Sequence, residues 1–95
     1  MLRQQIPVAQ RVFGKSSEHI LSHSEHMLKM RWVYAEALYK ADGATLEELR
    51  ESVETLEDTA RIARRVLGGA HPFTPRIEYR LREARAALRA REASV

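Results

Sequence analysis

The chain has 95 residues, which suits one small domain, and 44% of them are hydrophobic while 31% are charged. This composition is typical of a folded protein and not of a disordered tail. The lack of cysteine excludes a disulfide scaffold, a thiolate metal site and a cysteine nucleophile. No stretch approaches the ~20 apolar residues of a membrane-spanning helix, and we expect an intracellular, cytoplasmic protein without a membrane span.

The formal net charge of +3 is unevenly distributed along the chain. Residues 44–60 contain six acidic residues and one arginine, whereas residues 61–95 contain nine arginines and three glutamates. A basic end of this kind could face an acidic partner or a phosphate backbone. A solvated helix face is the simpler interpretation.

Helical periodicity dominates the sequence, and strand signals are absent from it. The first predicted helix covers residues 3–13, regular from about Pro7 and ended by Gly14. The second covers residues 17–41, begins after Ser16 or Ser17 and ends at Asp42-Gly43. Its candidate inner face, flanked by Trp32 and Tyr39, consists of Ile20, Ser24, Met27, Leu28, Arg31, Tyr34, Ala35 and Leu38.

The third predicted helix, residues 45–67, has the clearest pattern. Thr45 and Glu48 form a T-x-x-E capping box, in which each side chain satisfies a free amide at the helix start. Gly68-Gly69 supplies a left-handed residue that ends the helix. Its apolar residues are spaced alternately by three and four, which predicts one buried stripe of Leu46, Leu49, Val53, Leu56, Ala60, Ala63 and Leu67.

The last predicted helix covers residues 75–91, with Thr74 as its N-cap and Pro75 at its first position. An apolar stripe runs along it through Ile77, Leu81, Ala84 and Leu88.

A short segment of the chain recurs after 54 residues. Ala9-Gln10-Arg11-Val12-Phe13-Gly14 matches Ala63-Arg64-Arg65-Val66-Leu67-Gly68 in phase, and each copy is followed by a polar link and a new helix. Such a recurrence indicates a stacked helical repeat.

Residues 63–72 resemble the R-x-V-L-G-x-x-H-P join between tetratricopeptide repeats of the kinesin light chain type. Residues 34–39, followed by Asp42-Gly43, resemble the A-x-A-L-Y-x-x-x-G end of the first helix of such a repeat. The similarity covers roughly residues 9–91, with one full repeat at about 18–67 and a half repeat on either side.

The resemblance implies an all-α fold of antiparallel helical hairpins, a short α-solenoid, within a single domain over residues 1–95. It also implies a protein-binding role, commonly for an extended peptide in the concave groove. It makes His71, in the link, a structural residue that orients the next helix. Family members usually clamp the peptide with asparagines, but this chain has none.

A solenoid generally needs about three repeats, because each unit buries its apolar face only against its neighbours. This chain holds fewer than two, so we expect its open ends to be covered by another copy or another subunit. The predicted function is that of a non-catalytic interaction module, a small adaptor or a complex subunit. The predicted contact surface combines the second helix with an open stripe on the last one: Met27, Met30, Arg31, Trp32, Tyr34, Ile77, Leu81 and Leu88.

Three histidines, His19, His23 and His26, share one helix face. Two of them could bind a metal ion with ligands from another chain, but three along a straight helix are too far apart for one ion. We expect a polar, partly exposed stripe, no metal site and no cofactor. No serine or paired carboxylate stands in a catalytic motif, and we expect no enzymatic activity.

The alternative function is a structural subunit of a ribonucleoprotein that contacts nucleic acid through the C-terminal arginines. Those arginines are spread around the last helix and interrupted by glutamates, and Tyr79 is the one aromatic residue among them. Nucleic-acid binding favours a one-sided basic stripe with stacking aromatics.

Overall fold

A computed structural model describes residues 23–94 of the chain. Three helices make up 83% of this part, and it contains no strand, which confirms the all-α prediction. The first helix is described over residues 23–40, α2 spans Leu46–Val66 and α3 spans Phe73–Ala93. The helix predicted over residues 3–13 and the start of the one predicted over 17–41 lie outside the described residues.

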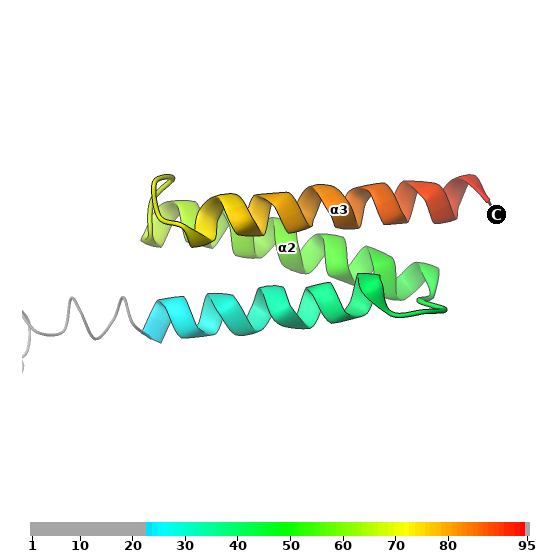
Figure 1. The fold of residues 1–95 in the computed structure, drawn as a ribbon, viewed down its shortest axis with the longest axis horizontal. Coiled ribbons are helices and arrows are strands. Elements are labelled where there is room, and N and C mark those ends of the chain that lie inside the picture. Colours follow the sequence, from blue (N-terminus) through cyan, green and yellow to red (C-terminus); the bar gives the residue numbers. More distant parts are fainter. Residues whose placement is uncertain (1–22, 95) are drawn as a thin grey trace, which may run out of the picture.

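The three helices run side by side with alternating direction, so consecutive helices form antiparallel hairpins (Figure 1). The first helix and α3 point the same way, and α2 runs in the opposite direction and packs against both of them. One hydrophobic core joins all three helices and includes Leu28 and Trp32 from the first, Leu56 from α2, and Ile77 and Leu81 from α3. The fold therefore depends on α2 contacting both of its neighbours.

The sequence prediction for α2 is confirmed at both ends. The Thr45 side chain accepts a hydrogen bond from the Glu48 amide, and the Glu48 carboxylate accepts one from the Thr45 amide. These two bonds complete the capping box. At the other end Gly68 has a φ of 90°, and the amides of Leu67 and Gly68 both donate to the carbonyl of Ala63. Between these ends the predicted stripe is buried, with Leu49, Val53, Leu56, Ala60 and Ala63 at its centre.

The turn before α2 is also as predicted. Gly43 has a φ of 74°, in the left-handed region that favours glycine, and the Ala44 amide donates to the carbonyl of Ala41. The chain therefore reverses at Asp42-Gly43 and enters α2 through Thr45.

The predicted start of the last helix is wrong by two residues. Helix α3 begins at Phe73, and Pro72 is its N-cap. Thr74 does not act as a cap, because its hydroxyl donates to the carbonyl of Gly68 at 2.8 Å and the residue is buried. Pro75 falls at the third helical position, where the backbone amide has no partner within the helix and proline is tolerated.

The predicted inner face of the first helix is rotated relative to the observed one. Leu28 and Ala35 are buried as expected, but Trp32, predicted to flank this face, is only 6% exposed and lies in the core. Met27 and Tyr34, predicted to point inward, are exposed. The reason is that the first helix packs against α3 as well as α2, which moves its buried face toward Trp32.

No helix in the described part of the chain has the length and apolar character needed to cross a bilayer.

The core position of Leu56 gives a direct test of this packing. Leu56 is fully buried at the centre of α2, so we expect Leu56→Ala to lower the free energy of unfolding by about 2–5 kcal/mol. Urea denaturation followed by circular dichroism measures this loss. The matched control is Val66→Ala on the same helix, because Val66 is 39% exposed and its truncation should cost much less. Equal losses for the two variants would contradict the packing described here.

Candidate functional site

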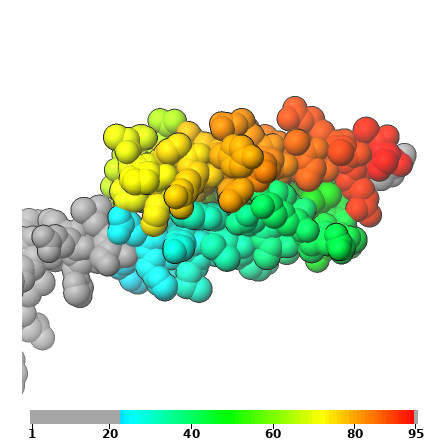
Figure 2. Space-filling view, viewed as in Figure 1, coloured from blue at the N-terminus to red at the C-terminus, as the bar shows by residue number. Residues whose placement is uncertain are grey.

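The first helix and α3 are joined along their length by polar side chains. Figure 2 shows these two helices packed against each other on one face of the molecule. Three contacts fix their relative position: Glu25 contacts His71 in the link before α3, Glu36 contacts Arg80, and Tyr39 contacts Glu83. Because these contacts are spread over several helical turns, they set the register of the surface between the two helices.

His71 organises the end of this surface where α3 begins. Its Nδ1 accepts the backbone amide of Phe73 at 3.0 Å, so the ring proton lies on Nε2 and is donated to the Glu25 carboxylate at 2.6 Å. The His71 ring meets the Phe73 ring edge-on, and Phe73 in turn meets Trp32 edge-on with centroids 5.0 Å apart. Both ring nitrogens of His71 therefore make contacts that hold the link in place.

A second cluster lies further along the same two helices. The Tyr39 hydroxyl donates a hydrogen bond to the Glu83 carboxylate, which also pairs with Arg80. The Nε atom of Arg80 in turn lies 3.4 Å from Oε2 of Glu36. Burial, and then the hydrogen bond to Glu83, raise the pKa of Tyr39 well above its usual range. The same hydrogen bond from Tyr39 lowers the pKa of Glu83. Glu83 is therefore held as a carboxylate and locks the two helices together.

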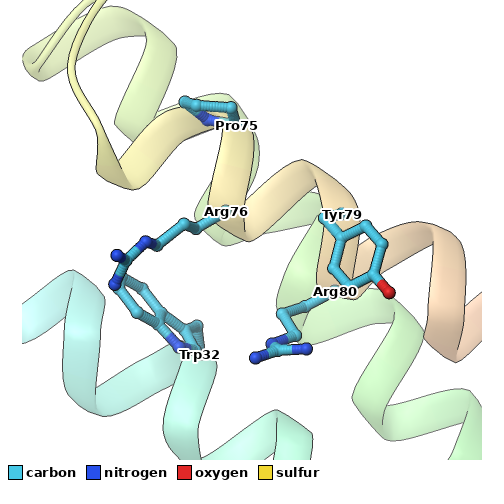
Figure 3. Close-up of a pocket in the computed structure, with 5 residues that line it drawn as sticks. All are labelled: Trp32, Pro75, Arg76, Tyr79 and Arg80. Carbon is cyan, nitrogen blue, oxygen red and sulfur yellow. The ribbon is translucent and has the colours of Figure 1, made fainter.

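A pocket of about 300 Å³ opens between the first helix and α3, close to the His71 link. Its wall is formed by Trp32 from the first helix and by Pro75, Arg76, Tyr79 and Arg80 from α3. Figure 3 shows the Arg76 side chain extending from α3 toward Trp32, with Arg80 and Tyr79 one turn further along. We name this feature the groove pocket.

The electrostatics of the groove pocket are basic. Arg80 is already paired with carboxylates, but among residues 23–94 no carboxylate forms an ion pair with Arg76. Arg80 and Arg82 lie 5.5 and 5.9 Å from the centroid of the Tyr79 ring, within the range of a cation–π contact. The pocket therefore combines aromatic surface with a guanidinium that can take an anionic group.

The structure divides the predicted contact residues into two sets. Exposed residues on the first helix include Met27, Met30, Arg31 and Tyr34. The others do not offer an open surface: Trp32, Ile77 and Leu81 are buried in the core, and Leu88 is partly buried against it. The expected open stripe on the last helix is thus corrected, because α2 covers that face of α3.

A further apolar surface lies on the outer side of the first helix. Met30, Val33 and Tyr34 form a shallow depression there together with His26 and Lys29. Val33 was not among the predicted contact residues, although its position three residues after Met30 puts both on one helix face. Arg76 and Pro75 carried no such signal, because only the packing of α3 beside Trp32 brings them to a pocket.

Two of the three histidines of the predicted polar stripe lie in the described part of the chain. His23 and His26 are exposed, and His19 lies outside the described residues. Among residues 23–94 no three histidine, aspartate or glutamate side chains are grouped closely enough to hold a metal ion.

Several of the arginines that a nucleic-acid interface would use make contacts within the chain. Arg64 pairs with Glu78 at 2.7 Å and Arg85 pairs with Glu57 at 3.0 Å, both between α2 and α3. Arg91 donates to the carbonyl of Ala44. These contacts engage three arginines within the fold, and that of Arg85 reaches a carboxylate of the acidic helix α2.

Comparison with known proteins identifies no relative: no family model, no curated protein and no solved structure matches the sequence. The contacts and surfaces described above therefore carry the functional argument.

The Tyr39–Glu83 pair predicts a specific pH dependence. Because the pKa of Glu83 is lowered in the folded state, its contribution to stability is present above the ordinary pKa of glutamate and is lost as the pH falls through the lowered value. We expect Tyr39→Phe to lower the free energy of unfolding by about 1 kcal/mol at neutral pH. The difference from the natural chain should shrink as Glu83 becomes protonated. Urea unfolding at a series of acidic pH values measures this, and a difference that stays constant would contradict the pairing.

The two contacts of His71 can be separated by two substitutions. His71→Ala removes both contacts, whereas His71→Asn keeps an acceptor near the position of Nδ1 and removes only the contact with Glu25. We expect the alanine variant to lose about 1–2 kcal/mol of stability and the asparagine variant to lose clearly less. Thermal unfolding of both variants provides the measurement. Equal losses would show that the amide contact with Phe73 contributes nothing.

Proposed function

We propose that this chain is a non-catalytic protein–protein interaction module that binds an extended acidic segment of its partner in the groove pocket. It would act as a small adaptor or as a subunit of a larger assembly. The observation that carries the proposal is the groove pocket itself, in which Arg76 has no carboxylate partner among the described residues. A guanidinium beside aromatic surface suits a carboxylate flanked by an apolar side chain.

The arrangement of the helices is consistent with the tetratricopeptide resemblance in the sequence. The first helix and α3 lie side by side and point the same way, and α2 packs against both from one side. We infer that the groove pocket belongs to the concave surface of such a repeat, and this correspondence supports a peptide-binding role.

The ribonucleoprotein alternative is the less favoured one. Arg85 of α3 is paired with Glu57 of α2, Arg64 of α2 is paired with Glu78 of α3, and Arg91 is hydrogen-bonded to a backbone carbonyl. Phosphate recognition by these three arginines would therefore have to break contacts within the fold.

A peptide-binding experiment tests the proposal. The probe is a short, proline-containing peptide, labelled with a fluorophore, that carries glutamates on either side of one leucine. We expect Arg76→Gln to weaken its binding about tenfold, because the variant removes the charge that meets the carboxylate. Tyr79→Ala should have a similar effect, since it removes aromatic surface from the pocket. Fluorescence anisotropy measures each dissociation constant.

The matched control for Arg76→Gln is Arg89→Gln. Arg89 is exposed on the same helix, and it lies about 140° around the axis from Arg76. The two variants carry the same change in net charge, so equal weakening would indicate non-specific attraction and would contradict the proposal. A single-stranded RNA that binds more tightly than the peptide, with a steep dependence on salt, would favour the alternative function.

A further inference from the structure

An apolar stripe on the outer side of the first helix is largely exposed, and its one polar contact is the hydrogen bond that the Tyr34 hydroxyl donates to Glu51 of α2 at 2.6 Å. Met27, Met30 and Tyr34 are spaced by three and four residues and are 43%, 58% and 51% exposed. Met30 lies about 160° around the helix from Trp32, so the stripe faces away from α3. Three large apolar side chains at helical spacing form a surface that a second helix could cover. We name it the outer stripe.

The recurrence in the sequence relates the outer stripe to a set of residues on α3. Residues 9–14 match residues 63–68 at an offset of 54. The same offset relates the outer stripe to a set of residues on α3, so that Met27, Met30 and Tyr34 correspond to Leu81, Ala84 and Leu88.

In the structure this set of α3 residues is the face that α2 covers. Leu81 is 8% exposed, Ala84 is fully buried and Leu88 packs against the core. The end of α2 contributes Ala63 and Leu67 to the same core. The ion pairs of Arg64 with Glu78 and of Arg85 with Glu57 set the antiparallel register of this contact, in which Leu81 and Ala84 face the last turns of α2 and Leu88 lies nearer its start. The first helix thus repeats at Met27 and Met30 the pattern with which α3 receives the last turns of α2.

We propose that the N-terminal segment Ile6–Phe13 docks on the outer stripe in the way that the end of α2 docks on α3. Residues 6–13 lie outside the described residues, and their sequence carries the apolar pattern that this docking requires. At the offset of 54, Ile6, Ala9 and Phe13 correspond to Ala60, Ala63 and Leu67, all of which belong to or pack against the core. An apolar face at the required spacing is therefore available in the same chain.

The length of the connection favours this segment over a second copy of the chain. Nine residues separate Phe13 from His23, as nine separate Leu67 from Ile77, and both links begin with glycine. In the observed link Gly68 adopts a φ of 90° and returns the chain onto α3. A tethered segment also has an effective concentration in the millimolar range, which a separate copy reaches only in very concentrated solution.

A paramagnetic label tests the docking directly. The chain has no cysteine, so Arg11→Cys creates a single attachment site for a nitroxide. Arg11 corresponds to the exposed Arg65, and a label there should not disturb the contact. We expect strong broadening of the NMR methyl signals of Met27 and Met30. A label on Arg89→Cys, at the far end of α3, is the control and should broaden them much less. Absence of broadening from Arg11→Cys would overturn the proposal.

A mixed sample separates docking within one chain from docking between two. It combines chains that carry the nitroxide but no NMR isotope with isotope-labelled chains that carry no nitroxide. Docking of the chain's own segment predicts no broadening in this mixture. Broadening of Met27 and Met30 here would mean that a second copy covers the outer stripe, and it would overturn the proposal.

Stability measurements add an independent test. We expect Phe13→Ala to lower the melting temperature by about 5 °C, as for the loss of a buried contact in a small domain. The matched control is Val12→Ala, because Val12 corresponds to the exposed Val66 and should shift the melting temperature little. Ile6 and Met30 correspond to Ala60 and Ala84, which lie at the same level of the α2–α3 hairpin, so the effect of Ile6→Ala should be clearly smaller on a Met30→Ala background. Full additivity of the Ile6 and Met30 changes would contradict a contact between Ile6 and the outer stripe.

Discussion

The structure depends on the burial of one apolar seam of α2 between two helices at once. Leu56 and Ala63 are fully buried at this seam, and Trp32 and Ile77 close over it from the first helix and α3. Small residues such as Ala60 and Ala63 let the neighbouring helices approach closely, while Leu56 fills the space between them. Because a single helix supports both neighbours, the position of each neighbour is fixed relative to the other, and a groove can exist between them.

Polar contacts then decide how the first helix and α3 are aligned. Apolar packing is non-directional, whereas the hydrogen bond from Tyr39 to Glu83 and that between His71 and Glu25 each permit one register. The buried hydroxyl of Ser52 adds a further constraint, since it donates to the carbonyl of Ala35 and ties α2 to the first helix at 2.8 Å. No buried side-chain polar atom in residues 23–94 lacks a hydrogen-bond partner, so the helices meet without an unsatisfied group that would favour sliding.

The sequence predicted those features that depend on local chemistry. The capping box at Thr45, the reversal at Gly43 and the left-handed Gly68 follow from short-range rules and were predicted correctly. Features set by contacts between distant residues were not. Thr74 resembles an N-cap in sequence, but its hydroxyl reaches back to Gly68. Trp32 was assigned to a partner surface, although α3 buries it, because periodicity within one helix does not show how many neighbours the helix has.

Trp32 connects the stability of the fold to the proposed binding surface. Its ring lies in the core and contacts Phe73, and one part of it still lines the groove pocket beside Arg76. A ligand in the pocket would therefore touch a side chain whose position reports the spacing of the first helix and α3. The outer stripe lies on another side of the first helix, so docking there would hold that helix in place without filling the groove. A helix fixed on three sides presents a pre-organised pocket, and such a pocket loses less conformational entropy when a partner binds.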